Sequence, residues 1–529
     1  QTFGGKFSSG SGAQENSYKY LTNYAAQEYL KYADTLTVVR VAPGATPAST
    51  FVTSSVFNAD SAIGSSSFSL TTLSDGAGQN SENDGGEGTN NTLSNGTENN
   101  LRYEINSVNN TKGTFNLVIR RGDDTIKRKS ILEQFNNLTL DPNTPNYISK
   151  VIGDMTFTLR DSGGTDPFLQ ASGSYINKSN YVRVTTHVTT YNYLDENGNV
   201  RDSALSSSLP AAGSGSFSGG SDGTVVHPIA FYENITNTNT QGHNVGSGQD
   251  GRTAYIDAIR LLKNQDEYDI NLLTLPGLVD NFTNHASVLT TALDMCEDRG
   301  DCFLILDPVE YGASISQATT KAESRDSNYA ATYWPWIKIP DIDLGKNVWV
   351  PAGTLLPSVY AFNDRVAAPW FAPAGLNRGG IDIAVMTERK LTHANRDTLY
   401  ESNVNPIATF PNAGVTVFGQ KTLQKKASAL DRVNVRRLLI AAKKFIASTT
   451  KFLVFENNTA ATRNRFLSIV NPYFENVQQR QGLYAFKVVM DETNNTPDVI
   501  DRNQMKGQIF LQPAKTAEFI IIDFNVLPT

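Results

Sequence analysis

The chain is poor in cysteine, methionine and charged residues, and it lacks a long apolar run. Of its 529 residues, two are cysteine, five are methionine and 18% are charged. The two cysteines, Cys296 and Cys302, offer no disulfide framework and indicate buried thiols in a reducing compartment. Because no stretch of about 18 apolar residues occurs, we expect no membrane insertion. The first ten residues lack the basic and apolar regions of a signal peptide.

Signatures of catalysis are absent as well. The histidines have no metal-ligand spacing, and no phosphate-binding GxxxxGK[ST] loop occurs. Residues 219–223, GGSDG, match the nucleophile-elbow pattern, but their surroundings have linker composition and lack the strand and helix that an elbow needs. Asp269 and Asp307 lie near the ends of expected strands, where turn or cap roles suit them because neither strand precedes a glycine-rich loop. We therefore expect a protein that is not an enzyme and has no cofactor or metal.

Length and composition favour a soluble protein of several domains. A chain of 529 residues with 39% hydrophobic residues exceeds what one core usually supports, so two to four domains are expected. The fold class we predict is an α/β (α+β) C-terminal core with a mixed sheet and flanking helices, plus one or two inserted all-β domains. The predicted segments are residues 1–42, which pack with the C-terminal core, 43–250 as the insertion, and 251–375 and 376–529 as the core domains.

The insertion is indicated by a sharp change in composition. From Ala45 to Asp250 the chain is rich in Ser, Thr, Asn and Gly, with short alternating segments such as FNLVIRR and YVRVTTHVTTY. Short strands separated by turn residues favour an all-β fold. Within it, the low-complexity stretch Asp75–Asn100 predicts a mobile loop. The Arg-Gly-Asp triplet at residues 121–123 lies between two strand-like segments and is predicted to be a hairpin turn.

Outside the insertion, helices and strands alternate. A helix over Tyr18–Tyr32 and a strand over Leu36–Val41 are predicted at the start. Residues 253–264 and 282–298 are predicted helices, and residues 269–277 and 303–308 are predicted strands. Strand, helix and strand with short links predict a parallel unit. Towards the end, residues 459–481 predict a helix, followed by strands in YAFKVVMDE, QIFLQPA and AEFIIIDFNVL.

The centre of the C-terminal half has two turn-rich stretches and an amphipathic helix. Residues 363–381 and 405–423 are dense in Pro, Gly, Asn and aromatics, which indicates ordered turns held by packed rings. Residues 431–444 predict a helix. Its apolar face consists of Val435, Leu438, Leu439, Ala442, Phe445 and Ile446.

Positive charge gathers on this helix. Eight basic residues and one acid between Lys421 and Lys444 give that segment +7, which leaves −14 for the rest of a chain whose net charge is −7. The helix lacks interleaved aromatics and the chain is acidic, so an acidic protein surface is a better partner than nucleic acid. A solvated helix face remains the alternative.

The chain ends in an almost unbroken apolar run. An exposed edge strand of this kind aggregates unless it is paired. The predicted terminal strand comprises Glu518, Phe519, Ile520, Ile521, Ile522, Asp523 and Phe524. Pairing within the chain's own sheet is one way to cover it and stays open.

Several motifs of the C-terminal half resemble one family. They are APWFAPAGLNRG (368–379), NPI…FPNAGVTVFGQKTL (405–423), VNVRRL (433–438), CEDRGDCFLILDPVE (296–310), NYAATYWPWIKIPD (328–341), FLVFENN (452–458) and AKTAEFIIIDF (514–524). Together, and in their order along the chain, they resemble contractile tail sheath proteins of bacteriophages, whose relatives occur in contractile injection machines. Residues 45–250 show no such likeness. Because the sequence begins at Gln1, we expect a trimmed form with part of the family's N-terminal arm missing.

The resemblance implies a structural subunit that polymerises helically around a tail tube and contracts without nucleotide hydrolysis. It implies as partners other copies of the chain, the tube protein, and baseplate and tail terminator proteins. The location would be the virion tail, after assembly in the host cytoplasm. The terminal strand would extend sheets of neighbouring subunits, with the core inside the sheath and the insertion outside. A basic surface would face the tube: Lys425, Lys426, Arg432, Arg436, Lys443 and Lys444. A competing surface lies on the next helix, with Arg463, Arg465 and Arg480.

Two other functions remain open at this point. One is the sheath of a related contractile injection machine. The other is a carbohydrate-binding or adhesive surface protein, which predicts saccharide binding by residues 45–250 and no self-assembly.

Overall fold

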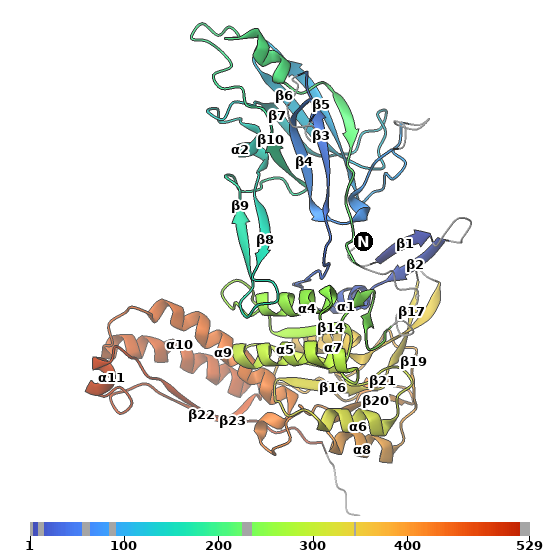
Figure 1. The fold of residues 1–529 in the computed structure, drawn as a ribbon. Coiled ribbons are helices and arrows are strands. Elements are labelled where there is room, and N and C mark those ends of the chain that lie inside the picture. Colours follow the sequence, from blue (N-terminus) through green and yellow to red (C-terminus); the bar gives the residue numbers. More distant parts are fainter. Residues whose placement is uncertain are drawn as a thin grey trace, which may run out of the picture. The chain divides into compact units, whose positions relative to one another are not determined.

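The computed structural model describes residues 4–8, 15–55, 64–83, 91–224, 235–342 and 345–518, with side chains from residue 20 onward. The fold has two compact units, each described here by itself (Figure 1). Unit 1 comprises Arg40–Val226 and Gly248–Asp257, and unit 2 comprises Phe3–Val39, His227–Ser247 and Ala258–Thr529. The predicted division into four segments stays a prediction.

Unit 1 is built mainly from two antiparallel sheets. One has the order β10-β4-β3 and the other the order β11-β5-β6-β7. The strands are β3 (Pro47–Thr53), β4 (Ser66–Asp75), β5 (Leu101–Asn109), β6 (Thr114–Arg121), β7 (Ile131–Leu138), β10 (Val182–Thr186) and β11 (Gly213–Ser216). Apolar side chains of both sheets share one core, in which Phe68 of β4 stacks on Phe115 of β6 at 5.7 Å between ring centroids.

Unit 1 also contains short helical pieces and a separate ribbon. These are η1 (Ala77–Gln79), α2 (Ile148–Ile152), η2 (Ser203–Ser208) and the hairpin of β8 (Thr156–Arg160) with β9 (Phe168–Ser172). Helix α4 (Asp250–Leu261) begins within unit 1 and ends within unit 2.

The loops of unit 1 are held by side chains. In the Arg-Gly-Asp triplet, Arg121 ends β6 and donates from Nε to Asp123 at 2.5 Å, so the predicted turn between two strands is confirmed. The Asn100 amide donates to the carbonyls of Asn80 and Asn95 at 2.8 and 2.6 Å. Asn100 thus links described parts of the predicted mobile loop, whose mobility stays a prediction; residues 84–90 lie outside the described residues.

Unit 2 is organised around a five-stranded sheet of order β14-β15-β16-β20-β21. The first four strands are parallel and β21 is antiparallel to β20. They are β14 (Leu272–Val279), β15 (Phe303–Asp307), β16 (Ala330–Trp334), β20 (Val404–Phe410) and β21 (Gly414–Val417). With α5 (Thr283–Arg299) between β14 and β15, the predicted parallel unit is confirmed. The stretch predicted as turns at 405–423 is in fact largely a β-hairpin.

Helices and a small sheet surround these strands. The helices are α1 (Leu21–Tyr29), α6 (Ile315–Glu323), α7 (Ala352–Val366) and α8 (His393–Glu401). The small sheet has the order β18-β17-β19, with β17 (Ile337–Asp341), β18 (Lys346–Val350) and β19 (Met386–Thr387). Short pairs β1 (Gly4–Ser8) with β2 (Glu15–Lys19), and β12 (Asn239–Thr240) with β13 (His243–Asn244), complete this part.

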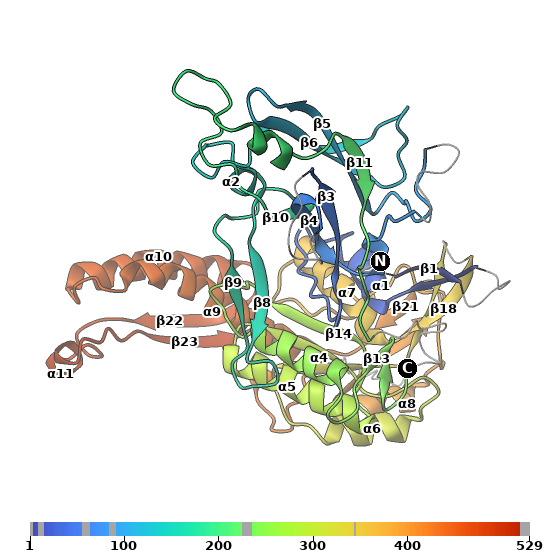
Figure 2. The same ribbon diagram turned by 45° about the horizontal axis from the view of Figure 1, so that its top comes forward.

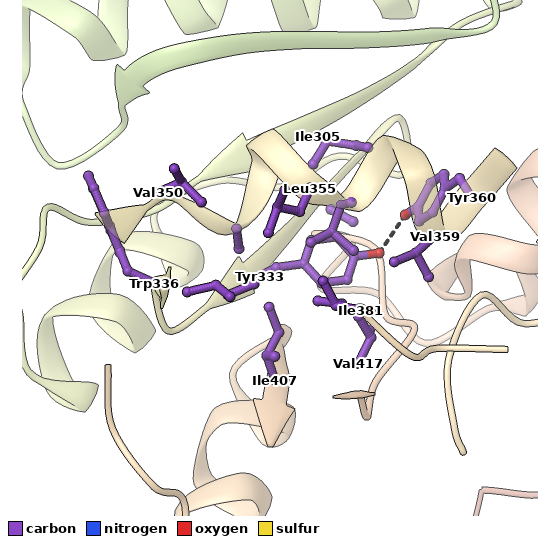
Figure 3. Close-up of a cluster of buried hydrophobic side chains, with 14 of the residues drawn as sticks. Ile305, Tyr333, Trp336, Val350, Leu355, Val359, Tyr360, Ile381, Ile407 and Val417 are labelled. Atoms are coloured by element: carbon purple, nitrogen blue, oxygen red, sulfur yellow. Dashed lines mark hydrogen bonds between the residues drawn. The ribbon is translucent and has the colours of Figure 1, made fainter. Parts of the chain in front are cut away.

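The main core of unit 2 joins the N-terminal helix to the distant C-terminal half. Leu21 and Tyr24 of α1 belong to the same buried cluster as the central sheet and α7. Within this cluster the hydroxyl groups of Tyr333 and Tyr360 form a buried hydrogen bond (Figure 3). The prediction that the N-terminal helix packs with this core is therefore confirmed. The strand predicted at Leu36–Val41 is wrong: these residues form no strand, because no partner strand lies beside them in the described part of the chain.

Asp307 ends β15 and is buried against the start of α7. Its Oδ1 accepts a hydrogen bond from the backbone N–H of Gly353 at 2.6 Å. The predicted cap role of Asp307 is thereby confirmed. Burial raises its pKa to about 7, although the bond from Gly353 opposes the rise.

A second cluster forms where two long helices lie along a hairpin. These are α9 (Val433–Thr450), α10 (Ala460–Gln479), and β22 (Leu483–Val489) paired with β23 (Gln508–Pro513). Figures 1 and 2 show α10 running beside the hairpin, and the buried side chains Phe466, Val470, Phe474 and Val477 hold it there. The short elements nearby are η3 (Ala429–Asp431), η4 (Lys451–Leu453) and α11 (Pro497–Asp501).

Candidate assembly surface

Helix α9 carries half of the predicted basic surface, namely Arg436, Lys443 and Lys444. Of its predicted apolar face, Val435, Leu438 and Ala442 are buried, whereas Leu439, Phe445 and Ile446 are half-buried. Phe445 stacks on Tyr473 of α10 at 4.0 Å between ring centroids. Leu438 and Ala442 of this face pack in the cluster around α10, whereas Val433 and Ile440, outside the predicted face, pack in the core of the central sheet.

Arg436 lies inside the protein and not on its surface, contrary to the prediction. Its side chain belongs to a residue only 4% exposed, and its guanidinium lies 3.9 Å from the centroid of the Tyr329 ring. It donates a hydrogen bond to Asn328 Oδ1. Burial lowers the pKa of Arg436, and Tyr329 partly opposes this shift. Arg436 is buried because its guanidinium stacks on the ring of Tyr329, about a hundred positions away in the chain. Helical spacing alone cannot reveal such a contact.

Arg437, the next residue, is buried as well. Its Nη1 and Nη2 donate to the two carboxylate oxygens of Asp364, at 2.8 and 2.5 Å, and its guanidinium lies 4.8 Å from the Tyr360 ring centroid. This bidentate geometry fixes α9 to α7, because the planar guanidinium matches the carboxylate.

Two further basic residues already have acidic partners within the chain. Arg432 Nε donates to Glu518 at 2.7 Å, and Arg432 also pairs with Asp431 at 3.0 Å. Lys444 donates to Asp269 and to the carbonyl of Ile270, and its hydrogen bond lowers the pKa of Asp269. With Arg437, three of the eight basic residues of this segment therefore have acidic partners within the chain, because acids distant in sequence fold onto them. Asp269 serves as an ion-pair partner, not in the predicted turn or cap role.

Three predicted residues remain exposed: Lys425, Lys426 and Lys443. Lys443 Nζ lies 3.3 Å from the Tyr329 hydroxyl. Lys426 borders a polar cleft of about 560 Å³ that is also lined by Glu297, Asp326 and Tyr329. The cleft mixes both signs of charge, so the accessible cations form a sparse surface and not a single-sign patch. On the competing helix, Arg463 is buried, whereas Arg465 and Arg480 are exposed.

Of the predicted terminal strand, only its first residue is described. Glu518 is not part of a strand and lies half-buried against Arg432. Phe519, Ile520, Ile521, Ile522, Asp523 and Phe524 lie outside the described residues. Their role stays a prediction.

An exposed apolar tip was missed by the sequence analysis. Phe452, Val454 and Phe455, between α9 and α10, are 78%, 60% and 103% exposed. Phe455 has a φ of 69°, a left-handed conformation that is unusual for a large side chain. The sequence FLVF shows that this segment is apolar, but only the fold shows that Phe452, Val454 and Phe455 face outward.

Within the described residues, no grouping of His, Cys, Asp and Glu could hold a metal ion. No helix in the same ranges is long and apolar enough to cross a membrane. The described surface has ion pairs, stacked rings and exposed apolar groups, which suits contact with other proteins.

Comparison with known proteins identifies the family. Residues 251–423 match the phage tail sheath protein central domain, and residues 425–526 match the phage tail sheath C-terminal domain. The chain belongs to the phage tail sheath family. The two matches cover the central sheet, α9 and α10, and they exclude the sheets of unit 1.

Curated relatives agree with this assignment to the sheath family. The tail sheath protein of Vibrio phage KVP40 is 42% identical over 184 residues, which is 35% of this chain and 27% of that protein. The tail sheath protein of Enterobacteria phage T4 is 36% identical over 252 residues, 44% of this chain and 38% of that protein. The chain thus matches well under half the length of each relative.

A solved structure shows the same fold. The crystal structure of a sheath tail protein from Listeria innocua superposes with a TM-score of 0.52, covering 93% of this chain and 86% of that one. The sequence identity is 10%, so the likeness concerns the fold alone.

Proposed function

We propose that this protein is a structural subunit of a contractile phage tail sheath. It polymerises helically around the tail tube and contracts to drive the tube through the host envelope, without nucleotide hydrolysis. The observation that carries this proposal is the pair of sheath-domain matches over residues 251–423 and 425–526. The curated relatives described above are phage proteins, which favours a phage tail over an injection machine.

Self-assembly is supported by the unpaired strand edges and exposed side chains of the β22–β23 hairpin. The β22–β23 hairpin is a two-stranded sheet, and its outer edges have no partner strand among the described residues. Both strands have exposed side chains, including Tyr484 of β22 and Phe510 of β23. An exposed edge of this kind accepts a further strand through backbone hydrogen bonds. The apolar segment 519–524 of a neighbouring subunit is the strand that we propose for this role.

Contraction without a nucleotide requires two lattices of different free energy. Subunits assemble in an extended lattice and relax to a shorter, wider one, and the driving free energy comes from the difference in contacts between subunits. Strand addition suits this change, because shared sheets hold the subunits while their bodies rotate.

The tube-facing surface that we propose consists of those predicted basic residues whose side chains are exposed. Lys425, Lys426 and Lys443 are exposed, whereas Arg436 is buried. Exposed ion pairs are worth about 0–1 kcal/mol each. A few of them attach a sheath to an acidic tube and still release it. Charge reversal at Arg436 would test folding and not attachment, so it is unsuitable as a probe of this surface.

The remaining partners follow from the proposed role. The sheath subunit would contact the baseplate at one end and the tail terminator at the other. It would be assembled in the host cytoplasm and remain in the virion tail. It would not be an enzyme.

Truncation tests the role of the terminal segment. Deleting residues 519–529 should leave a folded monomer that no longer polymerises, whereas the full chain sediments as large polymers. Sedimentation velocity distinguishes the two, and circular dichroism checks the fold. A truncated chain that polymerises as the full chain does would contradict the proposed strand exchange.

A further inference from the structure

The carboxylate of Glu518 lies in a cradle formed by three side chains that are distant in sequence. It accepts hydrogen bonds from Arg432 Nε at 2.7 Å, from the Tyr400 hydroxyl at 2.8 Å and from Gln420 Nε2 at 3.1 Å. Tyr400 belongs to α8, Gln420 follows β21, and Arg432 is the residue before α9. Three parts of the globular body therefore converge on one carboxylate.

The cradle is itself held in place. Gln420 is 3% exposed, and its Nε2 also donates to the Thr516 hydroxyl at 2.6 Å. The Nζ of Lys421 lies 4.6 Å from the centroid of the Tyr400 ring and donates to the Tyr400 carbonyl at 2.7 Å. The pKa of Tyr400 is raised by burial and by the adjacent Glu518 carboxylate, so its hydroxyl remains a donor. Such preorganisation lowers the entropy lost when a carboxylate binds.

We propose that Arg432, Tyr400 and Gln420 form a carboxylate-binding site whose ligand is Glu518, and that this site fixes the point where the C-terminal segment leaves the body. The inference rests on the proposed sheath function, since it assigns a role in positioning the strand that passes between subunits. It concerns the root of that segment and not the pairing of its apolar residues.

The stretch of chain between the last strand and Glu518 shows why such a site is useful. The last hydrogen bond of the β22–β23 region runs from the Ala514 N–H to the Gly482 carbonyl at 3.1 Å. Residues 514–518 then belong to no helix or strand. A free linker would spread residue 519 over a wide volume and lower its effective concentration at a neighbouring sheet. Binding Glu518 removes this freedom and keeps the root attached when the bodies rotate.

Limited proteolysis of the full chain tests the site directly. Lys515 is exposed and lies between the last strand and Glu518, so trypsin releases residues 516–529 when the root opens. Cleavage then follows the population of the open form. Glu518→Gln and Tyr400→Phe should each raise the cleavage rate by about tenfold, since a charge-assisted hydrogen bond is lost. The double variant should gain less than the product of the two. Glu475→Gln, an exposed acid on α10, is the control and should leave the rate unchanged.

Two readouts separate this inference from the proposed function. Fluorescence-detected unfolding should show that all variants remain folded, and sedimentation should show fewer or shorter polymers for Glu518→Gln. If Glu518→Gln is cleaved at the parental rate, the carboxylate site is refuted even when the parent polymerises. If cleavage rises but polymers form unchanged, the positioning role is refuted. If the parent itself never polymerises, the sheath proposal fails, and the cleavage rates still decide whether the site exists.

Discussion

The buried acid Asp307 gives the clearest quantitative prediction. Its carboxylate accepts the Gly353 N–H at the start of α7, and burial raises its pKa to about 7. The substitution Asp307→Asn keeps a side chain of the same shape and an oxygen that can accept the same bond. It removes only the group that titrates.

The sign of the pH effect follows from the raised pKa. An aspartate in the unfolded chain has a pKa of about 3.9, so between that value and about 7 the folded state of Asp307 holds a proton that the unfolded state has lost. The stabilisation is full below about pH 4 and disappears as the pH rises through about 7. From about pH 5 to about pH 8, the parent should lose about 3 kcal/mol of unfolding free energy relative to Asp307→Asn, at 1.36 kcal/mol per pKa unit.

Tryptophan fluorescence provides the assay. All four tryptophans (Trp334, Trp336, Trp349 and Trp370) belong to unit 2, so their emission during urea unfolding reports on the unit that contains Asp307. Measurements are made at low protein concentration across this pH range. Asp298→Asn, at an exposed carboxylate paired with Lys263, is the control and should keep the parental pH dependence.

Parallel curves for the parent and Asp307→Asn would contradict the raised pKa of Asp307. The two proteins would then lose the same free energy between pH 5 and pH 8. That result would mean that Asp307 is ionised throughout this pH range, because solvent or another group stabilises its charge despite the burial.

Three further outcomes are expected. Arg437→Gln should lower the unfolding free energy of unit 2 by about 2 kcal/mol, and Arg437→Lys should recover little of it, because lysine lacks the bidentate fork that binds Asp364; full recovery by lysine would contradict this. Phe455→Ser should change stability by less than about 0.5 kcal/mol yet reduce polymerisation in sedimentation, since the ring is exposed in the isolated chain. Lys426→Glu with Lys443→Glu should prevent co-sedimentation with tail tubes while tube-free polymers still form, and normal coating of tubes would rule out this surface.

Elements with a strong period could be predicted from the sequence. Helices α9 and α10 and the β14–α5–β15 unit have the expected positions, because a buried stripe or a continuous apolar run leaves a local signal. The segment Leu36–Val41 is also rich in β-branched residues, which predicts a strand, but it forms no strand. A strand needs a partner, and the sequence alone does not show whether one lies alongside.

The basic segment could be found from charge, but its surroundings could not. Asp364, Asp269 and Glu518 lie tens of residues from α9 in the chain, and only the fold brings them to Arg437, Lys444 and Arg432. A sum of charges therefore overestimates how much of the helix is free to bind a partner. The side chains that form the cradle around Glu518 could not be predicted for the same reason, since they lie far from Glu518 in the sequence.

The proposed function requires that this chain assembles into a helical sheath around a tail tube. Negative-stain electron microscopy of the purified protein, alone and mixed with tail tubes, shows directly whether it does. We expect hollow polymers of regular helical pitch from the protein alone, and tubes coated with the same repeat in the mixture. Dispersed monomers beside bare tubes, at concentrations where the protein is folded, would contradict the proposed function.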